Sequence, residues 1–228
     1  TGGTDYAKSS MKVFVDDRWL FLTMLGIAFF FFAGALVQVN IVRLAKIELG
    51  LEGRDTPISL LTAALALGIA VGSLVAGLVS RRRIEPGLVP LGALGLAVAA
   101  LVLGLPIQSY RASLGLLLGL GFAGGFYIVP LNAVLQQRSP KQMKGGMIAA
   151  NNFITFGGVL LAGLLFWIFG EVGLTSRHVF IITGVMTLAV GAYICWLLPV
   201  FLIRLVLWVL GNTVYRIKVL HGERVPDA

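Results

Sequence analysis

Hydrophobic positions fall in six long runs along this 228-residue chain, and polar positions gather in the stretches between them. A helix that crosses a bilayer needs about 20 predominantly apolar residues, and each run comes close to this length. The pattern therefore predicts an all-α membrane protein with six transmembrane helices. Because the connections are short, consecutive helices should be antiparallel neighbours in one bundle. The predicted spans are residues 19–42, 58–79, 88–105, 113–135, 145–170 and 179–198.

The residues outside the runs complete the predicted organisation. The chain begins without Met or a recognisable signal peptide, so we expect it to be part of a longer protein. Its last segment is apolar but is interrupted by Arg204 and Arg216, which favours an amphipathic helix in the membrane interface over a seventh crossing. Trp208 would lie at the level of the headgroups. The predicted parts are a cytoplasmic linker at 1–18, the six-helix bundle at 19–199 and the interfacial amphipathic helix at 200–228.

Composition and charge support a membrane protein and predict its orientation. The chain is 58% hydrophobic and only 12% charged, with a formal net charge of +8. Thirteen of its 18 Lys and Arg residues lie on the side of the two termini, and five lie on the other side. Cytoplasmic loops of membrane proteins carry such an excess of basic residues, so both termini are predicted to be cytoplasmic. The basic residues form no groove interleaved with aromatic residues, so nucleic acid is not an expected partner.

The titratable residues give no support for catalysis within the membrane. All ten Asp and Glu residues and both histidines, His178 and His221, fall outside the six runs. A proton-driven carrier usually keeps a carboxylate or a histidine inside the membrane. Two isolated histidines and one cysteine, Cys195, form neither a metal-ligand cluster nor a nucleophile with its base. We therefore expect no catalytic residue, no metal and no cofactor in this chain.

Uncharged polar residues are the remaining candidates for a functional site. They occur in the first, fourth and fifth runs, although plain hydrocarbon would suffice to span the membrane. One interpretation is a polar wall that binds the headgroup of a substrate. The other is a set of hydrogen bonds between helices, each worth ~1 kcal/mol or less, and the sequence leaves both open. The candidate substrate-pathway residues are Gln38, Asn40, Tyr127, Asn132, Asn151 and Asn152.

Small residues recur four positions apart in the second and fourth runs. Helix backbones in lipid approach each other where side chains are small, so these positions predict close helix contacts, in either a static or a sliding interface. Residues 32–34 and 122–124 both read Phe-Ala-Gly and each precedes an asparagine, as paired three-helix repeats would. The small positions are Ala64, Gly68, Gly72 and Ala76, then Gly115 with Gly119 and Gly121 with Gly125.

The loop after the second run gives a first resemblance to a known family. Together with the six runs and the polar leading segment, the stretch "GSLVAGLVSRRRIEPGLVPLG" resembles the C-terminal half of a major facilitator superfamily carrier. The loop motif of that superfamily has an acidic residue four positions after its glycine. The matching position, counted from Gly77, is Arg81, so the gating by charge that accompanies the motif is not carried over.

A closer resemblance is to the bacterial lysophospholipid transporter branch of that superfamily. It is carried by "YIVPLNAVLQQRSP" at 127–140 and "AANNF" at 149–153. The resemblance implies a secondary transporter that moves lysophospholipid across the bacterial inner membrane by alternating access. Its implied partners are membrane lipids, the lysophospholipid substrate and an N-terminal transporter half, and this segment is not expected to be an enzyme. It also implies that the first and fourth helices line the central cavity, which would place Gln38, Asn40, Tyr127 and Asn132 there.

The end of the chain resembles a different family. "FLIRLVLWVLGNTVYRIKVLHGERVP" is similar to the lead-in of glycerolipid acyltransferases, which are fused behind this transporter in some bacteria. The resemblance implies an acyltransferase domain after residue 228, and a longer parent chain with that domain would have enzyme activity. Two alternatives stay open: a permease or exporter for another small molecule, and a membrane platform that holds the acyltransferase near its substrate.

Overall fold

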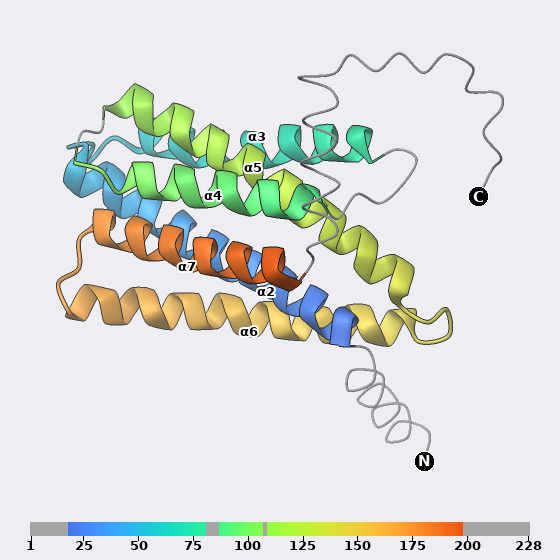
Figure 1. The fold of residues 1–228 in the computed structure, drawn as a ribbon. Coiled ribbons are helices and arrows are strands. Elements are labelled where there is room, and N and C mark those ends of the chain that lie inside the picture. Colours follow the sequence, from blue (N-terminus) through green and yellow to red (C-terminus); the bar gives the residue numbers. More distant parts are fainter. Residues whose placement is uncertain (1–17, 81–86, 107–108, 198–228) are drawn as a thin grey trace, which may run out of the picture.

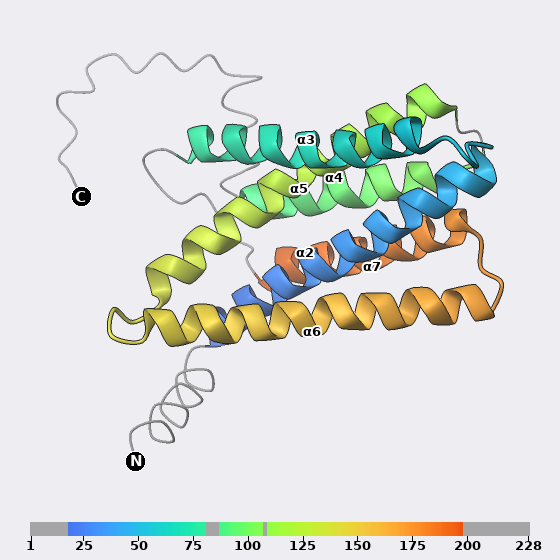
Figure 2. The same ribbon diagram turned by 180° about the vertical axis from the view of Figure 1, so that it is seen from behind.

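The computed structural model describes residues 18–80, 87–106 and 109–197. The predicted amphipathic helix at 200–228 lies outside these residues, as does the predicted linker up to residue 17. Six α-helices run side by side in the described part of the chain (Figure 1 and Figure 2). They are α2 (Arg18–Arg43), α3 (Asp55–Val79), α4 (Leu88–Leu103), α5 (Tyr110–Arg138), α6 (Lys144–Glu171) and α7 (Ser176–Leu197), and α2 continues into a π-helical turn, η1 (Leu44–Glu48).

Each of these helices occupies one of the six predicted runs. Five of them, all except α4, are long and apolar enough to cross a membrane. Helix α4 lies at the predicted position but has 16 residues, about 24 Å at 1.5 Å per residue, which is shorter than the ~30 Å hydrocarbon core. The all-α prediction is confirmed for the described residues, and five of the six predicted spans reach the length of a crossing.

The alternating direction of the helices brings both ends of the described bundle to one side. Figure 1 shows the start of α2 and the end of α7 at the right, where α5 also turns into α6. We call this the terminal end. The turns from α2 to α3 and from α6 to α7 lie at the other end, which we call the distal end. This is the arrangement expected of antiparallel neighbours, while the cytoplasmic location of the terminal end stays a prediction.

Helix contacts repeat between the first three helices and the last three. Helix α3 packs against α5 as α6 packs against α2, and α4 packs against α5 as α7 packs against α2. Helices α2 and α5 also contact each other, as do α4 and α7. Exchanging α2, α3 and α4 with α5, α6 and α7 therefore reproduces these contacts, although α2 also touches α3 without a matching contact of similar extent between α5 and α6. This supports the three-helix repeat suggested by the two Phe-Ala-Gly segments.

Glycines bring α3 and α5 into backbone contact. A Cβ atom added at Gly68 would collide with the carbonyl oxygen of Leu118, and one added at Gly72 would collide with the carbonyl oxygen of Phe122. Without side chains at these positions, the two backbones approach more closely than any other residue type would allow. The prediction of a close helix contact along α3 is confirmed.

The four glycines of α5 that the sequence pattern singled out divide into two pairs. Cβ atoms added at Gly121 and Gly125 would collide with the backbone of α3, whereas those added at Gly115 and Gly119 would meet nothing within 4 Å. Positions 119 and 121 are two residues apart, so they lie on different faces of the helix. The small-residue prediction is therefore confirmed for the second pair and wrong for the first.

The apolar core forms separate clusters toward the two ends of the bundle. Toward the terminal end, Leu20 of α2 packs in one cluster with Leu135 of α5 and Met147 of α6. Toward the distal end, Ile41 of α2 packs in another with Phe180 of α7. The parts of α2 and α5 between these clusters line a cleft.

Candidate functional site

A cleft of about 280 Å³ opens between α2 and α5. Helices α3, α4, α6 and α7 complete its walls. Most of the lining is apolar, with an aromatic segment at 29–31 on α2, and the cleft is partly open to the outside. An apolar cleft with few polar groups suits the hydrocarbon part of an amphiphilic ligand. The polar side chains of the lining are Gln38, Tyr127, Thr183 and Thr187.

Tyr127 forms the terminal side of the cleft and joins α5 to α2. Its ring is 1% exposed and stacks on Phe30 with the ring centroids 5.9 Å apart. Its hydroxyl donates a hydrogen bond of 3.2 Å to the carbonyl oxygen of Gly26. Because the hydroxyl proton is used within the protein, Tyr127 contributes to the cleft mainly through its ring.

Gln38 is the polar side chain of the cleft that keeps its hydrogen-bonding groups available. It is an exposed residue of α2, and its amide makes no hydrogen bond with any other described residue. A primary amide carries two donor hydrogens and an acceptor oxygen. Gln38 can therefore bind a polar ligand group at the edge of an otherwise apolar space.

Two threonines of α7 line the cleft but were not predicted from the sequence. Thr183 donates a hydrogen bond of 2.8 Å to the carbonyl oxygen of Val179, and Thr187 donates one of 2.7 Å to that of Thr183. Each hydroxyl thus bonds one turn back in its own helix, which is usual for threonine in a membrane span. Their methyl groups extend the apolar wall, and each oxygen keeps acceptor capacity.

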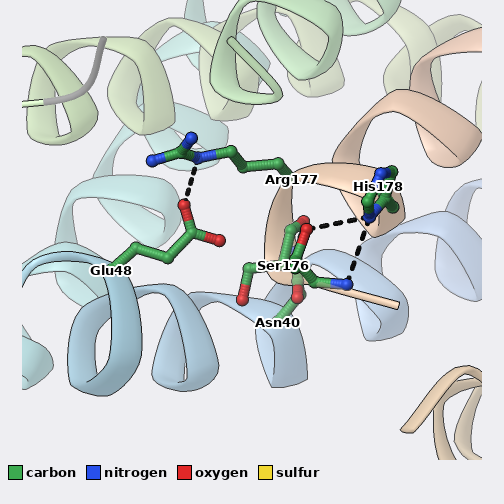
Figure 3. Close-up of polar contacts among 6 residues, drawn as sticks. Asn40, Glu48, Ser176, Arg177 and His178 are labelled. Atoms are coloured by element: carbon green, nitrogen blue, oxygen red, sulfur yellow. Dashed lines mark hydrogen bonds and ion pairs between the residues drawn. The ribbon is translucent and has the colours of Figure 1, made fainter. Parts of the chain in front are cut away.

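Asn40 lies away from the cleft, in a polar cluster at the distal end that joins α2 to α7 (Figure 3). The Asn40 side chain is fully buried and donates a hydrogen bond of 2.9 Å to the backbone oxygen of Ser176. Beside it, the Arg177 guanidinium forms an ion pair with Glu48 of η1. This geometry favours the interhelical hydrogen bond, one of the two interpretations of the amides, for Asn40.

Asn132 bonds within its own helix. Its amide nitrogen donates a hydrogen bond of 3.1 Å to the carbonyl oxygen of Ile128, one turn earlier in α5. Pro130 stands between these two residues without interrupting the helix. A proline has no backbone N–H, so the carbonyl oxygen of Phe126 loses its usual helical donor, whereas the Asn132 amide bonds the carbonyl of Ile128 and satisfies its own side chain within α5.

The two neighbouring asparagines of α6 have different surroundings. Asn151 is 6% exposed, and Thr155, one turn later, is also buried. At Gly158 an added Cβ would lie 3.1 Å from the carbonyl oxygen of Ala28, which shows that this face of α6 packs against α2. Asn151, Thr155 and Gly158 recur at spacings of four and three, so they share this face, and Asn152 on the next face is exposed.

The structure thus brings two of the six candidate residues, Gln38 and Tyr127, to the cleft. Asn40 and Asn151 are buried in helix packing, Asn132 is half-buried and bonds within α5, and Asn152 is exposed. A role of any of the six in contacting substrate stays a prediction. Among the described residues, no three His, Cys, Asp or Glu side chains lie close enough together to hold a metal ion.

Comparison with known proteins identifies a family and several relatives to which this chain is similar. Residues 4–163 match the sequence profile of the Major Facilitator Superfamily. The chain is 33% identical over 177 residues to the lysophospholipid transporter LplT of Klebsiella pneumoniae subsp. pneumoniae, and the aligned part is 76% of this chain. It is 33% identical over 159 residues to LplT of Pectobacterium carotovorum subsp. carotovorum, or 67% of this chain.

The aligned region is less than half of each relative. It amounts to 44% of the Klebsiella protein and 37% of the Pectobacterium protein. LplT of Yersinia enterocolitica shows the same relation, with 33% identity over 153 residues and 37% of its length covered. The similarity therefore concerns one part of a longer transporter.

Proposed function

We infer the function of this chain from one premise: it belongs to the Major Facilitator Superfamily. We propose that it is the C-terminal half of a bacterial transporter that moves lysophospholipid across the inner membrane by alternating access. The observation that carries the proposal is the apolar cleft between α2 and α5, with the free amide of Gln38 in its lining. A lysophospholipid has one acyl chain and a polar headgroup, so it needs apolar surface beside hydrogen-bonding groups.

The relatives support the choice of substrate. Each of the three compared above is named a lysophospholipid transporter. The absence of carboxylate and histidine side chains from the six hydrophobic runs argues against a proton relay in this part of the protein. We propose that the acyl chain occupies the aromatic part of the cleft and that the headgroup lies near Gln38.

The exposed surface of α6 supports a second half of the transporter. Phe153 is 82% exposed, Leu160 76% and Trp167 62%, and α6 packs mainly against α2. Large apolar side chains of this kind need lipid or another helix to cover them. Under the proposal, an N-terminal half shares this region, and the two halves rock against each other to open the cleft to each side in turn.

The proposal includes an acyltransferase domain after residue 228 in the parent chain and a cytoplasmic location for both ends of this segment. The resemblance of residues 201–226 to an acyltransferase lead-in supports the first. The excess of basic residues on the terminal side supports the second. This segment itself would bind and move lipid without catalysing a reaction.

Filling the cleft tests the proposal. Gly34 lines the cleft, and a Cβ added there meets nothing within 4 Å, so Gly34→Leu should fill the space without disturbing helix packing. Uptake of labelled lysophosphatidylethanolamine by proteoliposomes of the full-length protein should fall roughly tenfold or more. The leucine would exclude part of the acyl chain from the cleft, at a loss of about 0.8 kcal/mol per methylene group, and about 1.4 kcal/mol is a factor of ten.

Gly119→Leu is the matched control. Gly119 also has open space at its Cβ position but lies on a face of α5 that does not line the cleft. This variant should keep normal uptake at equal protein level. Normal uptake by Gly34→Leu would remove the cleft from the transport path, and absence of uptake by the unmutated protein would contradict lysophospholipid as the substrate.

A further inference from the structure

A shallow groove of about 530 Å³ lies beside the cleft on the outer surface of α2. Gln38, Val39, Val42 and Arg43 form it together with Phe166 of α6. The α2 residues recur at spacings of three and four, so they share one side of the helix. The groove therefore combines an apolar wall with one amide and one guanidinium at the distal end of the bundle.

The two polar side chains of the groove have no partner within the described residues. The guanidinium of Arg43 forms no ion pair or hydrogen bond there, and neither does the amide of Gln38. The nearby carboxylate of Glu48 is paired with Arg177 instead. An unpaired guanidinium at the edge of a membrane span offers several N–H donors in a planar fork, a shape that matches a phosphate group.

Gln38 belongs to the lining of both the cleft and the groove, so the two spaces adjoin. We infer that Arg43 binds the phosphate of the lysophospholipid while the acyl chain enters the cleft beside 29–31, so that the lipid lies with its headgroup toward the distal end. This inference rests on the proposed function and adds the site and orientation of the headgroup to it.

The amides at the terminal end fit this role less well. Asn132 donates one of its two amide hydrogens to the carbonyl oxygen of Ile128, and Asn151 is buried. Both are uncharged, whereas a phosphate is stabilised best by a cationic donor. The Arg43 groove is therefore a better match to the charge of the headgroup than the asparagines are.

Equilibrium binding of two lipids to the purified full-length protein tests the inference. The probes are labelled lysophosphatidylethanolamine and a labelled monoacylglycerol with the same acyl chain but no phosphate. Arg43→Gln should raise the Kd for lysophosphatidylethanolamine by roughly tenfold to a hundredfold, the range expected when a charge-assisted hydrogen bond is lost. It should leave the Kd for monoacylglycerol unchanged, which also shows that the cleft is intact.

Two further variants complete the experiment. Arg43→Lys keeps the charge but loses the planar fork, so its Kd for lysophosphatidylethanolamine should fall between those of the unmutated protein and Arg43→Gln. Arg54→Gln removes an exposed arginine at the distal end that does not line the groove and should change neither Kd.

The outcomes separate this inference from the proposed function. If the unmutated protein takes up lysophosphatidylethanolamine and Arg43→Gln binds it normally, or binds both lipids more weakly by the same factor, the headgroup site is not at Arg43, and the transport function stands. If the unmutated protein neither binds nor takes up lysophosphatidylethanolamine, the proposed function is wrong and this inference fails with it.

Discussion

At the scale of single residues, the polar side chains of the helices differ in where their hydrogen bonds go. Tyr127 and Asn40 donate to backbone oxygens 101 and 136 positions away in sequence, so they join separate helices. Asn132 and Thr183 donate to a carbonyl one turn earlier, which satisfies the side chain locally. Gln38 does neither. This difference in partners singles out Gln38 as the cleft residue most available to a ligand.

Removing the Tyr127 hydroxyl should weaken the contact between α2 and α5. Tyr127→Phe loses the hydrogen bond to Gly26 but keeps the stacking on Phe30, so we expect a loss of about 1 kcal/mol in the free energy of unfolding. Thermal unfolding of the full-length protein in detergent would measure it. A loss of lipid uptake with unchanged thermal stability would show instead that the hydroxyl contacts substrate.

At the scale of the helices, the sequence predicts length better than orientation. Span length is set by the thickness of the bilayer, and all six hydrophobic runs are helical. The face that each helix turns inward is harder to predict, because lipid-facing and core-facing side chains are both apolar. Asn151 and Thr155 are four residues apart, which places them on one face of α6, but this spacing does not predict that the face contacts α2. The bond from Asn40 to Ser176 depends on tertiary packing and has no local signal in the sequence.

The glycine contact between α3 and α5 offers a second prediction. Gly72→Ala places a Cβ atom on the backbone of Phe122, so it should lower the free energy of unfolding by about 3 kcal/mol or more. Gly119→Ala meets open space and should leave stability unchanged or slightly higher, since alanine is the better helix former. Thermal unfolding and folded yield would compare the two variants.

The same pair of variants separates the two interpretations of the small residues. If Gly72→Ala loses stability, the contact is a site of static packing. A Gly72→Ala protein that keeps its stability but transports more slowly would show that α3 and α5 slide past each other during the transport cycle.

At the scale of the whole molecule, the bundle has two ends of different charge character. Arg138, Lys141 and Lys144 lie at the terminal end, around the turn from α5 to α6. The distal end has basic residues as well, but acidic residues such as Glu48, which pairs with Arg177, accompany them. The positive-inside tendency therefore predicts that the terminal end is cytoplasmic.

Cysteine labelling in intact cells would test this orientation. With Cys195 replaced by Ser, a single cysteine at position 54 should react with a maleimide that cannot cross the membrane, whereas one at position 141 should react only after the cells are opened. Both positions are exposed and lie in connections between helices, so burial would not explain a difference. The reverse labelling pattern would contradict cytoplasmic termini.

Helices α2–α4 pack largely against helices α5–α7 rather than against one another, and this affects how the protein is assembled in the membrane. Helix α3 finds its main partner in α5, and α2 finds one of its main partners in α6, so neither is fully packed when the first three helices have been synthesised. Helices can insert into the bilayer separately and associate afterwards. During translation, the unpacked faces of α2 and α3 would therefore stay exposed to lipid until α5, α6 and α7 have been inserted. Over this interval the glycine face of α3 is open to other membrane proteins, and a chaperone that shields it would raise the yield of the folded protein.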